Sequence, residues 1–113
     1  MKEIKAIIQP FMLTKVIEAL QAIEGLPGVA ISELKGFGKK KTEGAQNKEI
    51  EDMIEYVRKV KLEIVVSDAM VEKVVSAIQE NAFTGKAGDG KIFIHTVDDV
   101  VKIRTNERGE GAL

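Results

Sequence analysis

The sequence predicts an α+β domain, residues 1–113, in which a four-stranded antiparallel sheet carries two helices on one face. The segments 4–20 and 62–78 align at an offset of 58 residues. Each begins with a short β-branched run and continues with apolar residues at helical spacing, and another strand candidate follows each helix. Two such βαβ units in one short chain are typical of the ferredoxin-like double βαβ arrangement.

In the first unit, a strand over 4–8 ends at Gln9-Pro10 and a helix follows. The helical positions expected to face the core are Leu13, Val16, Ile17, Leu20 and Ile23. The next strand is expected in "GVAISELK", which begins at Gly28. The first unit thus supplies two strands and one helix.

In the second unit, the strand over 62–66 ends at Ser67-Asp68, either of which is a plausible N-cap for the helix that follows. The apolar positions of this helix are Met70, Val71, Val74, Val75 and Ile78. The last strand is expected in "KIFIHTV", which begins at Lys91.

The two faces of the strand around 60–66 differ in character. One face is apolar throughout, and the other, formed by Lys61, Glu63 and Val65, is mixed. Because both helices cover the same side of the sheet, the mixed side needs another cover. We expect the chain to associate with copies of itself through this face.

The composition narrows the classes of function. The formal net charge is -1, which gives no global attraction to nucleic acid, and no cysteine and only one histidine are present. We therefore expect no nucleic-acid partner and no histidine-based metal site. No apolar run reaches the length of a membrane span, and the absence of disulfides fits a reducing compartment, so a cytoplasmic location is expected.

The two units are joined by an insertion over 39–59, which is far longer than a normal hairpin loop. Its first part is basic and its second part is acidic, with apolar residues at helical spacing from Ile50 to Val57. A transient helix, a docking stripe for a partner and the two sides of a long hairpin all fit this pattern.

The segment "TGKAGDGK", residues 84–91, combines three glycines with two lysines. It satisfies the first seven positions of a Walker A loop, but Ile92 stands where a magnesium-binding Ser or Thr is required, and the loop follows a helix instead of preceding one. This argues against a P-loop NTPase. A glycine-rich anion site and a plain connection between helix and strand both remain.

A second basic cluster lies near the carboxyl end. Lys102 and Arg104 are two residues apart and would share one face of an extended segment, and Arg108 follows them. This cluster and the glycine loop together would suit a polyphosphate, while a solvated charged strand explains the cluster almost as well.

From end to end, the chain resembles the nitrogen-regulatory PII signal proteins. "KAIIQPFMLTKVIEAL" is similar to the family's first strand and helix, and "ELKGFG" and "KVKLEIVV" flank a T-loop at 39–59. "TGKAGDGKIFIHTV" resembles the B-loop (84–91), and "VVKIRTNERGEGAL" the C-loop (102–109) and tail. The resemblance implies a homotrimer with a ferredoxin-like subunit that binds ATP or ADP in clefts between subunits.

Site residues follow from the resemblance position by position. Gly88, Asp89, Gly90 and Lys91 would form the phosphate-binding B-loop, and Lys102 and Arg104 would reach the phosphates from the adjacent subunit. The cleft around adenine and ribose would include Ile7, Gly36, Phe37, Gly38, Glu63 and Val65. Two positions depart from the family, where arginine is usual in place of Lys102 and threonine is frequent in place of Ala30.

The T-loop departs further. Asp52 occupies the place of the tyrosine that is uridylylated in the family, so that modification is not expected here. Lys40 replaces the glutamine that helps to hold Mg-ATP and 2-oxoglutarate, and an ammonium group cannot coordinate Mg²⁺. Two roles for Lys40 remain. It could contact a phosphate directly, which would favour ADP or AMP, or it could be a solvated lysine of the loop. Binding of 2-oxoglutarate is expected to be weak or absent.

The expected function is regulatory and not enzymatic. The resemblance implies a sensor of adenine nucleotides that signals through its T-loop to a partner protein, such as a membrane transporter or a metabolic enzyme. Two alternatives from other classes are a nucleotide-hydrolysing enzyme that uses the near-Walker loop and a divalent-cation tolerance trimer. No catalytic residue and no metal ligand are assigned.

Overall fold

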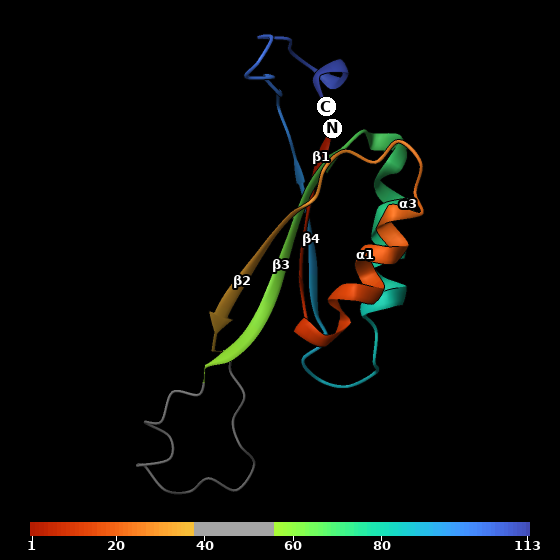
Figure 1. Ribbon diagram of the computed structural model, residues 1–113, viewed down its shortest axis with the longest axis vertical. Helices are drawn as coiled ribbons and strands as arrows, with labels where there is room; N and C mark the ends of the chain where they lie inside the picture. The colour runs from red at the N-terminus through yellow and green to blue at the C-terminus, as the bar shows by residue number, and fades with distance from the viewer. Residues whose placement is uncertain (38–55) are drawn as a thin grey trace, which may run out of the picture.

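The computed structural model describes residues 1–37 and 56–113. The four strands are β1 (Lys2–Ile8), β2 (Ala30–Gly36), β3 (Val57–Val66) and β4 (Gly90–Thr96), and the two helices are α1 (Leu13–Gln21) and α3 (Val71–Ala82). Single 3-10 turns, Pro10–Met12 and Asp68–Met70, lead into the helices, and a third, Glu110–Ala112, lies near the carboxyl end. The order of elements is β-α-β twice, as the sequence predicts (Figure 1).

The sheet has the strand order β2-β3-β1-β4, and all three neighbouring pairs are antiparallel. β1 lies at the centre, where Ile7 is opposite Lys61 of β3 and Lys91 of β4. The first strand of each unit is thus central, and the last strand of each unit is at an edge. This is the ferredoxin-like arrangement, and the prediction of fold class is confirmed.

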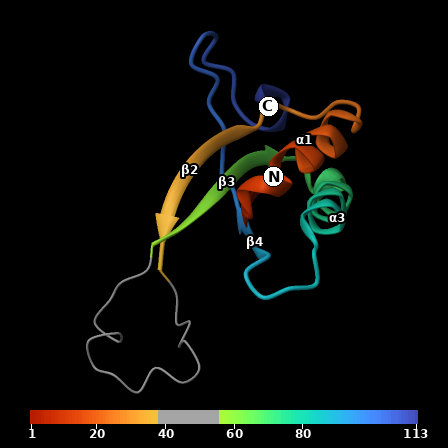
Figure 2. The same cartoon turned by 60° about the horizontal axis from the view of Figure 1, so that its bottom comes forward.

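Both helices lie side by side on one face of the sheet (Figures 1 and 2). Buried and half-buried residues alternate along β3 from Val60 to Val66, because successive side chains of a strand point to opposite faces. The core between helices and sheet is almost entirely aliphatic, and its largest fully buried members are Ile4, Ile8, Val16, Leu20, Leu62, Ile64, Val66, Val74 and Ile78. Each such side chain contributes about 1.5–3 kcal/mol by leaving water.

The start of α3 differs from the prediction of a side-chain N-cap. Ser67 precedes the 3-10 turn but makes no capping hydrogen bond, and α3 itself begins one turn later, after Met70. The Asp68 carboxylate instead accepts a hydrogen bond from the amino group of Met1 at 3.0 Å. This ion pair lowers the pKa of Asp68, chiefly through the hydrogen bond.

The opposite face of the sheet has no helix on it among the described residues (Figure 2). It carries the mixed row expected from the sequence, in which Lys61 and Glu63 form an ion pair at 3.1 Å and Phe93 of β4 is 43% exposed. Whether copies of the chain cover this face stays a prediction. In the described part of the chain, no helix has the length and apolar character needed to cross a membrane.

Candidate functional site

The glycine loop connects α3 to β4 and reverses the chain over the seven residues 83–89. Gly85, Gly88 and Gly90 have φ angles of 84°, 96° and 102°, which lie in the region that disfavours side chains. At Gly90 the constraint is also steric, since an added Cβ would lie 1.7 Å from the carbonyl oxygen of Ile7. Glycine is therefore required at this position by the pairing of β4 with β1.

The Asp89 carboxylate holds the loop closed. It accepts hydrogen bonds from the backbone N–H of Thr84 at 2.8 Å and of Gly85 at 3.0 Å, and from the Thr84 hydroxyl. These bonds, that of the Thr84 hydroxyl first, lower the pKa of Asp89. The carboxylate thus stabilises the conformation of the loop, because its oxygen atoms accept hydrogen bonds from Thr84 and Gly85 of the same loop.

The loop also contacts the beginning of β3. The Lys59 ammonium group donates a hydrogen bond to the carbonyl oxygen of Gly88. A Cβ at Gly88 would lie 3.0 Å from the Gln9 side-chain amide, so the loop, β3 and the end of β1 meet there. Gly88 therefore lies against both the beginning of β3 and the residue that follows β1.

Four of the predicted site residues line one cavity of about 380 Å³ beside the loop, namely Ile7, Asp89, Gly90 and Lys91. Its wall includes Phe83, which is 60% exposed. Glu63 and Val65 lie on the same sheet face as Ile7, because the register places Ile7 opposite Lys61 and strand side chains alternate. Ala30 lies opposite Glu63 on β2. The helix-free face thus carries Ile7, Lys91, Glu63 and Val65. The cavity beside the loop is also lined by Ile78, Gln79 and Ala82 of α3, so it reaches toward the helix side of the sheet.

The predicted residues at the T-loop base divide between described and undescribed parts of the chain. Gly36 ends β2, and Phe37 follows it and meets Tyr56 edge to face, with ring centroids 6.4 Å apart. Gly38, Lys40, Asp52 and the expected apolar stripe as far as Ile54 lie outside the described residues. β3 begins at Val57, so the last three residues of the insertion 39–59 belong to the strand.

The second basic cluster does not form the extended strand that the spacing of Lys102 and Arg104 suggested. Residues 103–105 form a turn, in which Lys102 N–H donates to Glu107 C=O at 2.9 Å and Asn106 N–H to Lys102 C=O at 2.7 Å. Asn106 takes a left-handed conformation with φ 60°. A bridge between Val101 and Arg108 makes residues 101–108 a hairpin, called here the basic hairpin. Lys102 is half-buried and Arg104 is exposed near the tip of this hairpin, so they do not share one face of a strand.

The glycine loop and the basic hairpin lie at opposite ends of the subunit, as Figure 1 shows. The loop precedes β4 and the hairpin follows it, and a strand of seven residues spans about 20 Å. Lys91 and Arg104 of one chain therefore cannot both contact the same phosphate group. A site that uses both requires two subunits.

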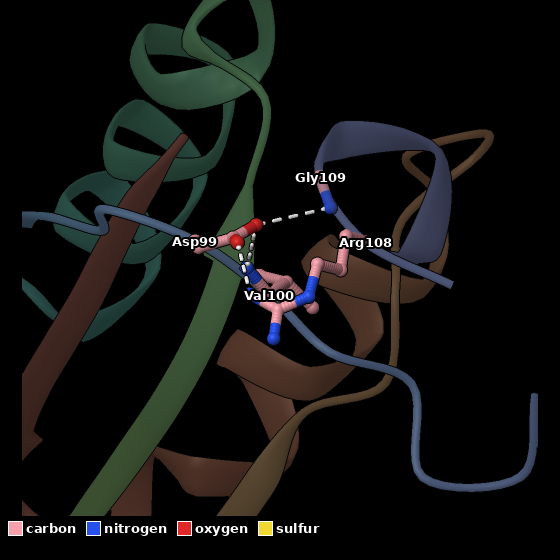
Figure 3. A network of polar contacts seen from close by, with 4 residues as sticks. All are labelled: Asp99, Val100, Arg108 and Gly109. Atoms are coloured by element: carbon pink, nitrogen blue, oxygen red, sulfur yellow. Dashed lines mark hydrogen bonds and ion pairs between the residues drawn. The ribbon is translucent and has the colours of Figure 1, made fainter. Parts of the chain in front are cut away.

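Two contacts at the site were not predicted from the sequence. One is the bond between Lys59 and Gly88, and the other is a network around Asp99, shown in Figure 3. The bond from Val100 N–H to Asp99 could have been expected from the sequence, because Asp side chains often accept hydrogen bonds from nearby backbone N–H groups. Its bonds to Arg108 and Gly109 have no such local signal. Within residues 1–37 and 56–113, no group of three or more potential metal ligands is found.

Comparison with known proteins places the chain in a family. The family model described as nitrogen regulatory protein P-II matches residues 1–107. The chain is 46% identical to the nitrogen regulatory protein P-II of Rhodospirillum rubrum and 45% identical to that of Azospirillum brasilense, in both cases over 113 residues and the full length of both chains. A crystal structure of Arabidopsis thaliana PII bound to citrate is similar, with a TM-score of 0.79 and 42% identity over 99% of this chain and 91% of that one. The chain therefore belongs to the nitrogen regulatory protein P-II family of signalling proteins.

Proposed function

We propose that the chain is a regulatory homotrimer that binds ATP or ADP in the clefts between subunits. One subunit supplies the glycine loop with Lys91, and its neighbour supplies Lys102 and Arg104. The observation that carries this proposal is the placement of the glycine loop and the basic hairpin, the two candidate phosphate-binding elements, at opposite ends of one subunit. Rotational assembly brings unlike ends of identical chains together, and it completes one site at each interface.

The glycine loop suits a polyphosphate in its backbone and its charge. Gly85, Gly88 and Gly90 take positive φ angles, and a phosphate can approach the backbone at these positions without meeting a Cβ. Asp89 does not oppose the anion directly, because its carboxylate is engaged by Thr84 and Gly85. Lys91 adds a positive charge at the beginning of β4.

The sheet face around Ile7, Glu63 and Val65 would receive the adenine and ribose, together with Gly36 and Phe37 at the end of β2. Its half-buried aliphatic groups suit a purine ring, and the Glu63 carboxylate suits a ribose hydroxyl or an exocyclic amine. The mixed face that lacks a helix would be covered by the neighbouring subunits. Trimer formation and nucleotide binding are therefore coupled in this proposal.

The chain is proposed to act on a partner protein through the T-loop, as a regulator and not as an enzyme. A membrane transporter and a metabolic enzyme are the classes of partner we consider. The bond from Lys59 to Gly88 supports communication between the two loops, since Lys59 lies at the end of the 39–59 segment and Gly88 in the nucleotide loop. A ligand that engages Gly88 would change the partner of Lys59.

Titration calorimetry with ATP, ADP and AMP tests the proposal. We expect saturable binding of at least one nucleotide, with one site per subunit. Arg104→Ala should weaken ATP binding by about 1.5–3 kcal/mol, because a charge-assisted hydrogen bond to phosphate is lost. Light scattering should give the mass of a trimer. The absence of binding by all three nucleotides would refute the proposal.

A second titration addresses 2-oxoglutarate. Lys40 carries an ammonium group where the family has a glutamine, so we propose that Mg-ATP does not create a 2-oxoglutarate site here. Titration of 2-oxoglutarate into protein saturated with Mg-ATP should give little or no heat. Lys40→Gln should gain such binding, whereas tight binding by the unmodified chain would contradict this part of the proposal.

A further inference from the structure

One carboxylate, that of Asp99, reinforces the backbone pairing at the open end of the basic hairpin. One oxygen atom of Asp99 accepts hydrogen bonds from the backbone N–H of Val100 at 2.8 Å and of Gly109 at 3.1 Å, and the other accepts one from the Arg108 guanidinium group at 3.0 Å (Figure 3). The network thus joins residue 99 to residues nine and ten positions further along.

These bonds lie at the open end of the hairpin that carries Lys102 and Arg104. Inside the network, Val101 pairs with Arg108, and Gly109 N–H donates to Val100 C=O at 3.0 Å. The turn itself is completed by the bonds of Lys102 and Asn106. The direction in which Arg104 leaves the subunit therefore depends on where Asp99 holds residues 108 and 109.

Arg108 cannot be counted as a free positive charge of the basic cluster, because it is paired with Asp99. By sequence Arg108 belongs to the basic cluster, but its guanidinium group is paired with Asp99, and both side chains are exposed, at 67% and 43%. The pKa of Asp99 is lowered, first by the Val100 N–H and then by Arg108, so the carboxylate is ionised near neutral pH and keeps this pair intact.

We propose that Asp99 and Arg108 are positioning residues, which set the geometry of Lys102 and Arg104 for phosphate binding without contacting the nucleotide themselves. This inference rests on the proposed nucleotide site. An alternative role for Arg108, direct contact with a phosphate, predicts the opposite effect of removing Asp99. Loss of the carboxylate would then release a cation and strengthen nucleotide binding.

The test measures ATP and adenosine binding by calorimetry with the full-length protein. Asp99→Asn keeps the size of the side chain and one acceptor oxygen but removes the charge, and Arg108→Gln removes the guanidinium group. Each should weaken ATP binding about fivefold, which is the scale of an exposed ion pair. The double variant should be no weaker than either single variant, because both remove the same pair. Adenosine binding should not change, and Arg108→Lys should retain part of the ATP affinity.

Asp98→Asn is the matched control, because the neighbouring Asp98 is exposed and loses the same charge. A general electrostatic effect would strengthen ATP binding equally in the Asp98 and Asp99 variants. Hydrogen exchange of the Gly109 and Lys102 amides should become faster in Asp99→Asn without ligand, while the amides of β1 stay protected. This separates local opening of the hairpin from general unfolding.

The outcomes are distinguishable. If the unmodified protein binds ATP and Asp99→Asn binds it equally well or more tightly, the positioning role is wrong and the proposed function stands. If the unmodified protein binds no nucleotide, both are wrong. Weaker ATP binding in both single variants, without additivity and with unchanged adenosine binding, supports the inference.

Discussion

The replacement of Gly90 by alanine tests the geometry of the glycine loop most sharply. The new Cβ would lie 1.7 Å from the carbonyl oxygen and 2.8 Å from the carbonyl carbon of Ile7, both of which are backbone atoms of β1. The φ angle of 102° adds conformational strain for any residue with a side chain. Strain at such a φ costs about 1–3 kcal/mol, and a forced backbone shift costs about 1–3 kcal/mol more.

Two other glycines separate the cost of the positive φ from the cost of the steric clash. Gly25 has φ 77° but no atom within 4 Å of an added Cβ, and Gly28 has open space without a positive φ. Thermal unfolding should therefore rank the variants. Gly28→Ala should lie within about 0.5 kcal/mol of the unmodified chain, and Gly25→Ala about 1–2 kcal/mol below it.

Gly90→Ala should be the least stable of the three, by about 3 kcal/mol or more relative to the unmodified chain. A loss of this size lowers the melting temperature by on the order of 10 °C in a domain of this length. Equal melting temperatures for Gly90→Ala and Gly28→Ala would refute the close approach of β4 to β1 at this point.

Three further predictions concern the loops. The stability contributed by Asp89 should be lost as pH falls below about 4, because its pKa is lowered by folding, and acid titration should show a smaller loss for Asp89→Asn. Asn106→Ala should destabilise the chain by about 1 kcal/mol and Asn106→Gly much less, as denaturant unfolding would show, because φ is positive there. Lys59→Met should speed hydrogen exchange of the glycine loop, and unchanged exchange would argue against the bond to Gly88.

The fold was largely predictable because its signals are local and repeated. The alternation of Val60, Leu62, Ile64 and Val66 predicts a strand with one buried face. This prediction does not depend on which strands lie beside it. β3 begins earlier than the strand predicted over 62–66, because Val57 and Arg58 are exposed and give no alternating pattern. Their pairing with Gly36 and Lys35 agrees with one alternative for the insertion, the side of a long hairpin. The expected cap at Ser67 failed because a 3-10 turn intervenes and the Asp68 carboxylate has another partner.

The sequence indicates the residue types of the candidate site but much less of its geometry. The three glycines and Lys91 predict a candidate anion site, and Gly85, Gly88 and Gly90 have the positive φ angles that such a loop needs. The shape of the hairpin with Lys102 depends on Asn106 and on the distant pairing of Asp99 with Gly109, for which spacing alone gives no rule. The order of charged residues in the sequence also does not reveal that Arg108 forms an ion pair with Asp99.

The central claim is that each nucleotide site is shared between two subunits, and a mixing experiment tests it most directly. Lys91→Ala impairs the glycine loop and Arg104→Ala impairs the hairpin, so each homotrimer should bind ATP weakly. If the two variants are unfolded, mixed and refolded together, about one site in four receives an intact loop from one chain and an intact hairpin from the other. Calorimetry of the mixture should then detect a minority of sites with the full affinity of the unmodified protein. A mixture that binds no better than its separate components, although mixed trimers are present, would contradict a shared site.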